Sequence, residues 1–315
     1  MKIAVISPLF SRHLELMQEL ETSFSDVTCN HDNRLKTKED IIAFLQGVDA
    51  AIVGREVIDD DILAQCPTLK ILSRYGVGLD NLDLEAMQKR GIALGWSGGT
   101  NANSVAEITL GFMLTLLRNL YSSTSLMKQG IWKVAGGREL SGKTIGLFGF
   151  GHISKRVVEL LAPFHCRILV YNRTHNHEEA RKYGITFASK EILLAECDII
   201  SIHLPLTQET HALFSRKEFQ MMKKDAFIIN TARGGIIDEE ALKMALQKGE
   251  IAGAALEAFA IEPVEDQELI ALQNLICTPH IGGNSKESIL NMGYSCIGHL
   301  KEFFTCKNKN SDIYN

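Results

Sequence analysis

A glycine-rich turn in the middle of the chain has the residue types that bind a dinucleotide. It reads Gly149-Phe150-Gly151-His152-Ile153-Ser154 and lies between an apolar run at 144–148 and a helix-like run at 155–161. The first glycine permits a sharp turn, the second lets backbone approach a pyrophosphate, and the first N–H groups of the helix face the phosphates. Ser154 replaces the usual third glycine, and its small side chain still permits close packing of helix on strand. A glycine loop without a ligand is the alternative for so short a pattern.

The residues that follow the next apolar run bear on the choice of cofactor. After the run at 167–171, where an acidic residue would bind the ribose 2′-hydroxyl of NAD, the chain reads Asn172-Arg173-Thr174. Asn172 removes the carboxylate that would repel a 2′-phosphate, and Arg173 adds a cation that could pair with one. The pattern therefore favours NADP, with NAD as the other possibility. An exposed loop arginine that binds no ligand remains the alternative for Arg173.

Three further residues could transfer a proton and bind a carboxylate beside such a cofactor. Arg233 follows an apolar run at 226–230, where open α/β sheets place their ligands, and its planar fork suits a carboxylate. His280 follows another apolar run, at 276–279, and could act as the acid/base. Glu262 could hydrogen-bond the second ring nitrogen and favour the protonated imidazole. Taken alone, Arg233 could instead form a surface ion pair, and His280 could be structural.

The elements that must position these residues follow a βαβ rhythm. Near-continuous apolar runs that alternate with helical patterns indicate parallel sheets covered on both faces. The glycine turn begins only near residue 145, so the preceding half of the chain predicts a separate N-terminal α/β domain. A long helical stretch at 103–129 carries an apolar stripe, which is typical of a core or of a subunit interface. The runs lie at 2–7, 50–54, 69–74, 92–95, 144–148, 167–171, 198–204, 226–230, 252–256 and 276–279.

The composition of the 315 residues is that of an ordinary globular protein with two domains. Hydrophobic residues make up 45% and charged residues 23% of the chain. A net charge of -5 argues against a nucleic-acid surface, and no apolar run reaches the ~18 residues of a membrane span. The seven cysteines are scattered, without the spacing of a metal site or a disulfide framework. We therefore expect no metal and no membrane or nucleic-acid partner, and a cytoplasmic protein.

Five motifs in order make the chain resemble the D-isomer-specific 2-hydroxyacid dehydrogenases, in particular their phosphoglycerate dehydrogenase-like members. Besides the glycine turn these are 74–81, 104–107, 203–207 with the Arg233 segment, and 278–283. The resemblance implies a Rossmann dinucleotide-binding domain at 100–284. It also implies that this domain is inserted into a discontinuous, flavodoxin-like substrate domain at 1–99 and 285–315. Both would be doubly wound parallel-sheet domains of the α/β class.

The resemblance also implies a role for each residue of the site. Arg233, Glu262 and His280 match the catalytic arginine, glutamate and histidine of the family. Substrate would be bound by Tyr75, Val77, Gly78 and Arg233. The residues expected at the cofactor are Gly149, Gly151, His152, Ile153, Asn172, Arg173, Thr174, His203, Pro205, Thr231, Ala232, Glu257, His280 and Gly282. Glu257 departs from the aspartate of the family by one methylene, at a position that helps to hold the nicotinamide carboxamide.

The implied activity is NAD(P)-dependent interconversion of a small 2-oxoacid and a D-2-hydroxyacid. The substrate could be 3-phosphoglycerate, or glyoxylate or hydroxypyruvate, and the direction in the cell stays open. A phosphorylated substrate would need distal cations, for which Arg55 and Arg74 are candidates, although both could be surface charges. The stripe at 103–129 resembles the dimer helix of the family and predicts a homodimer. The alternative function is a dinucleotide-sensing, corepressor-like binding protein on the same fold.

Overall fold

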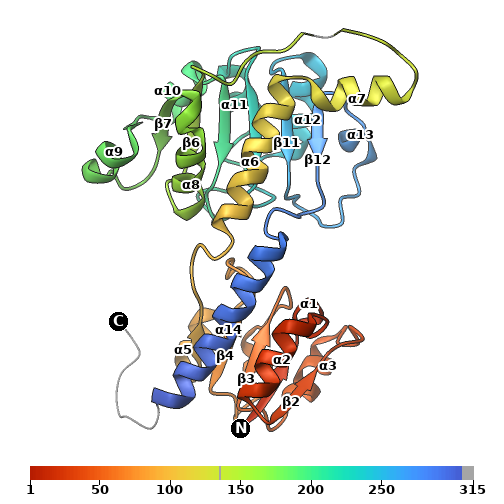
Figure 1. The fold of residues 1–315 in the computed structure, drawn as a ribbon, viewed down its shortest axis with the longest axis vertical. Coiled ribbons are helices and arrows are strands. Elements are labelled where there is room, and N and C mark those ends of the chain that lie inside the picture. The colour runs from red at the N-terminus through yellow and green to blue at the C-terminus, as the bar shows by residue number, and fades with distance from the viewer. Residues whose placement is uncertain (135, 307–315) are drawn as a thin grey trace. The chain divides into compact units, whose positions relative to one another are not determined.

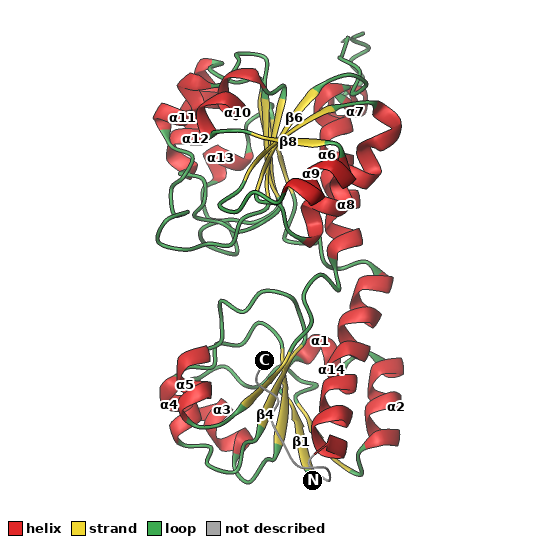
Figure 2. Ribbon diagram, turned by 90° about the vertical axis from the view of Figure 1, so that its left-hand side faces the viewer, coloured by secondary structure: helices red, strands yellow, loops and turns green. Residues whose placement is uncertain are grey.

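A computed structural model describes residues 1–134 and 136–306, and the chain divides into two compact units. Unit 1 comprises Met1–Asn101 together with Lys286–Asn315, and unit 2 comprises Ala102–Ser285. The last nine residues of the chain lie outside the described range. Each unit has its own parallel sheet with helices on both faces (Figures 1 and 2).

The sheet of unit 1 has five parallel strands in the order β2-β1-β3-β4-β5. This is the flavodoxin-like order, in which the direction of winding reverses between β1 and β3 and ligands bind at the carboxyl ends of the strands. Every side chain of β3 is buried, as expected for a central strand covered on both faces. The strands are β1 (Lys2–Val5), β2 (Asp26–Cys29), β3 (Ala50–Val53), β4 (Ile71–Arg74) and β5 (Ala93–Gly95).

Six helices cover this sheet, three on each face (Figure 2). Their starts are set by local sequence: the Thr37 hydroxyl and the Asp40 carboxylate form a reciprocal capping box, and Asp59 and Asp83 cap two others. One face carries α1 (Pro8–Ser11), α2 (Leu14–Ser23) and α14 (Lys286–Cys306), and the other carries α3 (Lys38–Leu45), α4 (Asp60–Ala64) and α5 (Leu84–Lys89).

The sheet of unit 2 has seven parallel strands in the order β12-β11-β10-β9-β6-β7-β8. Winding reverses between β6 and β9, which is the Rossmann arrangement, and the crevice at that reversal is where dinucleotides bind. The strands are β6 (Thr144–Phe148), β7 (Arg167–Tyr171), β8 (Ile185–Phe187), β9 (Ile199–Ile202), β10 (Phe227–Asn230), β11 (Gly253–Leu256) and β12 (Leu275–Cys277).

The helices of unit 2 form two layers, each packed over its own hydrophobic cluster (Figure 2). One layer contains α6 (Ala102–Leu117), α8 (His152–Leu161) and α9 (His177–Tyr183), with a short 3-10 turn at Ala162–Phe164. The other contains α10 (Lys190–Glu196), α11 (Arg216–Met221), α12 (Glu239–Lys248) and α13 (Gln267–Ile270). Helix α7 (Leu120–Lys128) follows α6 and adds no residue to either cluster. No helix among the described residues is long and apolar enough to cross a membrane.

The predicted α/β class with two doubly wound parallel sheets is confirmed, and two local features differ from expectation. The helix expected at 103–129 is broken, because Asn119 adopts a left-handed conformation (φ 51°) that ends α6 and starts α7. The strands β2 and β8 had no counterpart among the predicted runs. Both are edge strands whose side chains are mostly not buried, so their sequences lack a continuous apolar run.

Candidate active site

The glycine turn connects β6 to α8, and its geometry requires the glycine at its first position. Gly149 has a φ of 94°, and a Cβ placed there would lie 2.6 Å from the carbonyl oxygen of His203. Ser154, which stands where a third glycine is usual, is buried and donates a hydrogen bond to the Gly149 carbonyl at 2.7 Å. The serine therefore closes the turn through its hydroxyl rather than merely fitting beside it.

The helix that follows this turn is open at its amino end. Gly151 is the N-cap residue and provides no side-chain cap, and a Cβ added to it would meet no atom within 4 Å. Within the described chain, the N–H groups of His152 and Ile153 donate no hydrogen bond to protein. Such a helix end attracts an anion through its free N–H groups and its dipole. The turn thus fits the diphosphate of a dinucleotide.

His203, at the end of β9, faces the same reversal point of the sheet. Its Nε2 is 2.9 Å from the Ser201 hydroxyl, whereas its buried Nδ1 has no hydrogen-bond partner among the described residues. Burial lowers the pKa of His203 to about 4, so the ring is neutral at neutral pH. Buried polar groups normally have a hydrogen-bond partner, and a bound cofactor would supply the one that this nitrogen lacks. Pro205 is exposed two residues further along, and its carbonyl accepts a hydrogen bond from Thr210.

Asn172 joins the end of β7 to the glycine turn. Its side-chain oxygen accepts a hydrogen bond from the Phe150 N–H at 3.3 Å, and its amide donates to the Thr174 carbonyl at 2.7 Å. Arg173 and Thr174 are exposed. This loop therefore presents an arginine and no carboxylate where the ribose of a dinucleotide is expected.

Arg233 lies in a tight turn after β10, and the buried side chain of Asn230 stabilises this turn through two hydrogen bonds. Asn230 donates to the Arg233 carbonyl at 2.7 Å and accepts from the Ala232 N–H at 3.0 Å. Gly234 cannot carry a side chain, because a Cβ there would lie 1.9 Å from the carbonyl carbon of Phe259. Since Phe259 donates from its N–H to Glu262 at 3.2 Å, the arginine turn packs directly on the loop that carries the glutamate.

His280 and Glu262 form a hydrogen-bonded pair. Nδ1 of His280 lies 2.9 and 3.0 Å from the two carboxylate oxygens of Glu262. Both side chains are about one-third exposed, 33% for the histidine and 34% for the glutamate, so the pair can be reached by a ligand. With Nδ1 bound to a carboxylate, the ring is oriented so that Nε2 is the nitrogen for proton transfer.

Glu257 is buried beneath the histidine loop and engages it at three points. Its carboxylate accepts hydrogen bonds from the Thr278 hydroxyl at 3.0 Å and from the N–H groups of Ile281 and Gly282. Burial raises the pKa of Glu257, and these hydrogen bonds oppose that shift. Both carboxylate oxygens are thus bonded to the loop that carries His280, although the sequence predicted Glu257 at the nicotinamide carboxamide. In this loop His280 has a φ of 54°.

Helix α6 is hydrogen-bonded to the turn that carries Arg233 and to the loop that carries His280. Thr109 and Thr231 are buried with their hydroxyl oxygens 3.2 Å apart, and the Ser104 hydroxyl donates to the Gly282 carbonyl at 2.6 Å. Thr231 and Ala232 are both buried, with 8% and 9% of their surface exposed.

The predicted substrate residues of unit 1 form a loop after β4. The side chain of Tyr75 is only 8% exposed and packs edge-on against Phe10, so it belongs to the core. The N–H groups of Val77 and Gly78, by contrast, donate to no other group within the described range. Tyr75 can thus contribute only backbone, while Val77 and Gly78 offer N–H groups that suit an anion.

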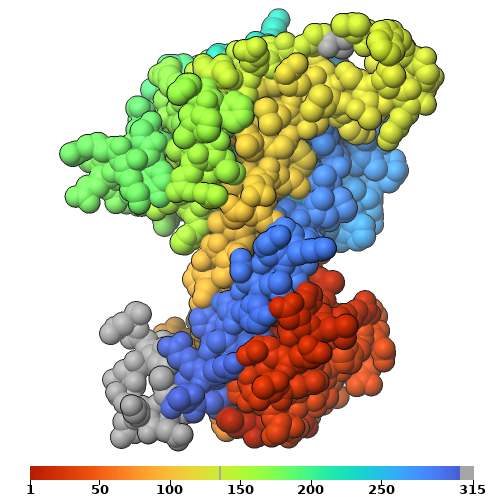
Figure 3. Space-filling model, viewed as in Figure 1, coloured from red at the N-terminus to blue at the C-terminus, as the bar shows by residue number. Residues whose placement is uncertain are grey.

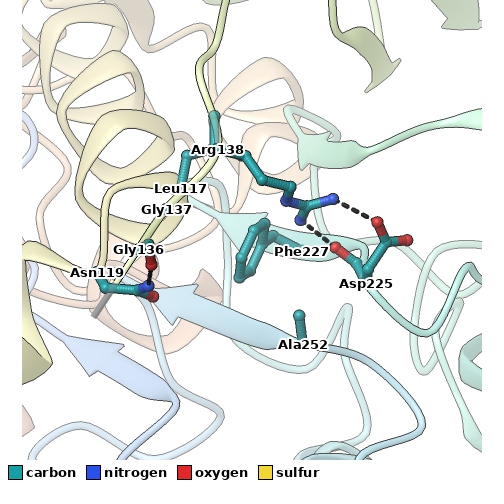
Figure 4. A pocket seen from close by; sticks show the side chains of 8 residues that line it. All are labelled: Leu117, Asn119, Gly136, Gly137, Arg138, Asp225, Phe227 and Ala252. Atoms are coloured by element: carbon teal, nitrogen blue, oxygen red, sulfur yellow. Dashed lines mark hydrogen bonds and ion pairs between the residues drawn. The ribbon is translucent and has the colours of Figure 1, made fainter. Parts of the chain in front are cut away.

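One surface pocket of unit 2 lies at the amino ends of its strands. Its volume is about 320 Å³, and it is lined by residues at the amino ends of β10 and β11 (Figure 4). Arg138 crosses the Phe227 ring at 5.1 Å and pairs with Asp225 at 2.5 Å. Because the catalytic loops follow the carboxyl ends of these strands, this pocket is separate from them.

Two residues of the site make contacts that the sequence pattern does not reveal. Asn230 bonds the backbone of its own turn, at Ala232 and Arg233, and Glu257 bonds the loop after β12, which depends on β11 and β12 being paired. A buried polar residue at the end of an apolar strand was the one sign available, since such a group needs a partner.

The two units therefore have the fold and the residues of a nicotinamide-dependent dehydrogenase. Residues 110–282 match the family described as D-isomer specific 2-hydroxyacid dehydrogenase, NAD binding domain. The chain belongs to the D-isomer specific 2-hydroxyacid dehydrogenase family.

Three relatives give the range of activities found at this similarity. The glyoxylate reductase of Thermococcus litoralis is 34% identical over 84% of this chain and 83% of its own length. The hydroxypyruvate reductase of Thermotoga maritima is 33% identical over 94% of this chain and 96% of its own. The D-3-phosphoglycerate dehydrogenase of Methanocaldococcus jannaschii is 35% identical over 91% of this chain, which spans only 54% of that enzyme.

Solved structures agree with this assignment. A putative D-isomer specific 2-hydroxyacid dehydrogenase from Polaromonas has a TM-score of 0.87 and 26% identity, with 96% of both chains covered. An acyclic imino acid reductase in complex with NADPH and D-Arg has a TM-score of 0.86, 25% identity and 98% coverage of both chains. The protein is thus an oxidoreductase that acts on CH–OH groups with a nicotinamide cofactor. Each relative named is an enzyme, so the alternative of a dinucleotide sensor has no support.

Proposed function

We propose that the protein reduces a small 2-oxoacid to the D-2-hydroxyacid, with Arg233, Glu262 and His280 as its catalytic residues. The relatives act on glyoxylate, hydroxypyruvate or phosphoglycerate by name, and the substrate of this chain belongs to that group. The observation that carries the proposal is the His280–Glu262 pair at 2.9 Å, on loops packed against the Arg233 turn.

In the proposed reaction each side chain has one task. When bound, the nicotinamide supplies the hydride that reduces the 2-oxo carbon. Protonated His280 gives its proton from Nε2 to the developing alkoxide, and Glu262 stabilises the charged imidazole until then. Arg233 binds the substrate carboxylate with its guanidinium and polarises the carbonyl. The proton lost by His280 is replaced from solvent, so one 2-oxoacid, one reduced cofactor and one proton give the hydroxyacid and the oxidised cofactor.

We propose further that NADPH is preferred over NADH. Asn172 is neutral and its side chain is bonded to Phe150 and Thr174, so the loop carries no carboxylate against a 2′-phosphate. Arg173 is exposed on the same loop and can supply a charge-assisted hydrogen bond. NADH remains usable, because the absence of a carboxylate removes the discrimination against NADPH and does not itself weaken the binding of NADH.

We propose a homodimer, with the interface on α7 and the segment after it rather than on the buried stripe of α6. None of the residues of α7, all of which are described, is buried. Trp132 and Val134 are 82% and 88% exposed, and the segment forms a yellow ridge in Figure 3. Light scattering should give twice 34.9 kDa, and Trp132→Ser with Val134→Ser should give monomers. Leu14→Ser, at another exposed leucine, is the control; a wild-type mass of 34.9 kDa would contradict the proposal.

A substrate panel tests the proposed reaction. Glyoxylate, hydroxypyruvate, pyruvate and 3-phosphohydroxypyruvate are each supplied with NADH or NADPH, and the nicotinamide absorbance is followed. We expect turnover on at least one acid, the D-isomer wherever the product is chiral, and a kcat about 10²–10⁴-fold lower for the His280→Ala variant. Absence of turnover on every acid, or an L-product, would refute the proposal.

A further inference from the structure

The side chain of Arg74, at the end of β4, is turned into its own unit. Its Nε donates to the Gly78 carbonyl at 2.6 Å, and its Nη1 donates to the Tyr75 carbonyl at 2.7 Å and to the carbonyl of Gly54. Gly54 follows β3, and the winding of the unit 1 sheet reverses between β3 and its neighbour β1. One guanidinium thus joins the loop after β3 to both ends of the loop after β4.

Three carbonyl oxygens of the loop after β4 accept hydrogen bonds from side chains, whereas two of its amides donate to no group of the described chain. Besides the two bonds from Arg74, the Val77 carbonyl accepts from the Trp96 indole N–H at 2.9 Å. The N–H groups of Val77 and Gly78 make no bond to another group of the described chain. A loop whose carbonyls are bonded inward presents its N–H groups outward, which is the requirement for binding a carboxylate.

Gly76 shows how closely the guanidinium fits this loop. A Cβ on Gly76 would lie 2.8 Å from Nη1 and 2.9 Å from Cζ of Arg74, and its φ of 142° is one that other residues rarely adopt. The loop therefore closes over the arginine, with no room for a methyl group between them.

We propose that Arg74 is a positioning residue that shapes the carboxylate-binding loop, and that it does not bind a distal phosphate of the substrate. The proposal rests on the 2-oxoacid reduction proposed above. If Nε and Nη1 of Arg74 turned out of this loop to a phosphate, the carbonyls of Tyr75 and Gly78 would lose these bonds, and the Gly54 carbonyl would keep only its bond from the Asn81 amide. The loss of these part-buried hydrogen bonds makes that exchange unfavourable.

The first test is Arg74→Lys in the full-length protein, because lysine keeps the charge and loses the planar fork. We expect the KM for glyoxylate and for hydroxypyruvate to rise about ten- to a hundred-fold, the range for a lost hydrogen bond to a charged group. The cofactor KM should not change, and kcat should fall less than the KM rises. Arg90→Lys, at another arginine of unit 1 that pairs with Asp60, is the matched control.

The same variant separates positioning from phosphate binding. A KM that rises for 3-phosphohydroxypyruvate alone, with glyoxylate unaffected, would overturn the proposal. If Arg74→Lys does not fold, Gly76→Ala decides the matter, because it displaces the guanidinium and removes no charge. We expect Gly76→Ala to raise the KM for every acid, and an unchanged KM would overturn the proposal.

A binding experiment tests the role of Arg74 independently of whether the protein turns over a 2-oxoacid. Oxamate, an unreactive analogue of a 2-oxoacid, is titrated calorimetrically into wild type and Arg74→Lys in the presence of cofactor. Weaker oxamate binding by the variant supports the loop role even if no acid is turned over, in which case the proposed reaction fails and the inference stands. Equal oxamate affinity of the two proteins would overturn the inference.

Discussion

Replacement of Glu257 by glutamine tests whether this buried carboxylate holds the histidine loop or the cofactor. In the wild type its two oxygens accept from the Thr278 hydroxyl and from two backbone N–H groups, those of Ile281 and Gly282. Glutamine has one acceptor oxygen and one NH2 group. Whichever way the amide is turned, one of the two backbone N–H groups then faces another donor.

The expected loss follows from that geometry. A buried N–H group left without an acceptor costs about 1–3 kcal/mol. In a domain of roughly 150–250 residues each kcal/mol lowers Tm by about 2–4 °C. We therefore expect Glu257→Gln to melt roughly 2–12 °C lower and to have a lower kcat, since His280 lies in the loosened loop. The cofactor KM should change little.

Calorimetric melting and steady-state kinetics distinguish the two roles. Glu265→Gln, which removes an exposed carboxylate nearby in the chain, is the matched control and should melt like the wild type. Glu257→Asp keeps the charge but is one methylene shorter, so it should restore only part of the stability. An unchanged Tm together with a raised cofactor KM would refute the loop role and return Glu257 to the nicotinamide.

Four further variants test the site. His280→Ala should lower kcat by about 10²–10⁴-fold and leave cofactor affinity unchanged, and Glu262→Gln should move the pH optimum of reduction to lower pH because the imidazolium loses its carboxylate. Near-normal turnover or an unmoved profile in kinetic assays would contradict the pairing. In direct titration, the double variant Asn172→Asp with Arg173→Ala should bind NADH more tightly than NADPH, the reverse of the wild type. A wild type that already prefers NADH would contradict the proposed preference for NADPH. Burial lowers the pKa of His203 to about 4, so the unfolded chain binds a proton that the folded chain does not. The stability that the neutral His203 ring gives the folded protein is complete above about pH 6.5 and is lost at about 1.4 kcal/mol per pH unit as the pH falls toward 4. We therefore expect Tm to depend less on pH in this range for His203→Asn than for the wild type. Equal slopes of Tm against pH for the two proteins would refute this.

Most of the strands that the sequence revealed lie inside the sheets, and the edge strands β5 and β12 are the exceptions. β3 and β9 are buried on both faces, so their apolar runs are continuous and can be read without a structure. β2 and β8 lie at sheet edges and bury less, and no such run marks them. The break at Asn119 was also hidden, because the apolar pattern continues across it while the backbone changes conformation.

By itself, the sequence determined the α/β class, the two doubly wound sheets and the residue types for hydride and proton transfer. These are properties of periodicity and of short motifs, which depend on neighbouring residues along the chain. Only the tertiary structure decided how Arg74 and Glu257 are used. Each is a charged residue that bonds a segment distant in the chain, Arg74 the carbonyl of Gly54 and Glu257 the loop at 278–282, and a sequence pattern records the charge but not that contact.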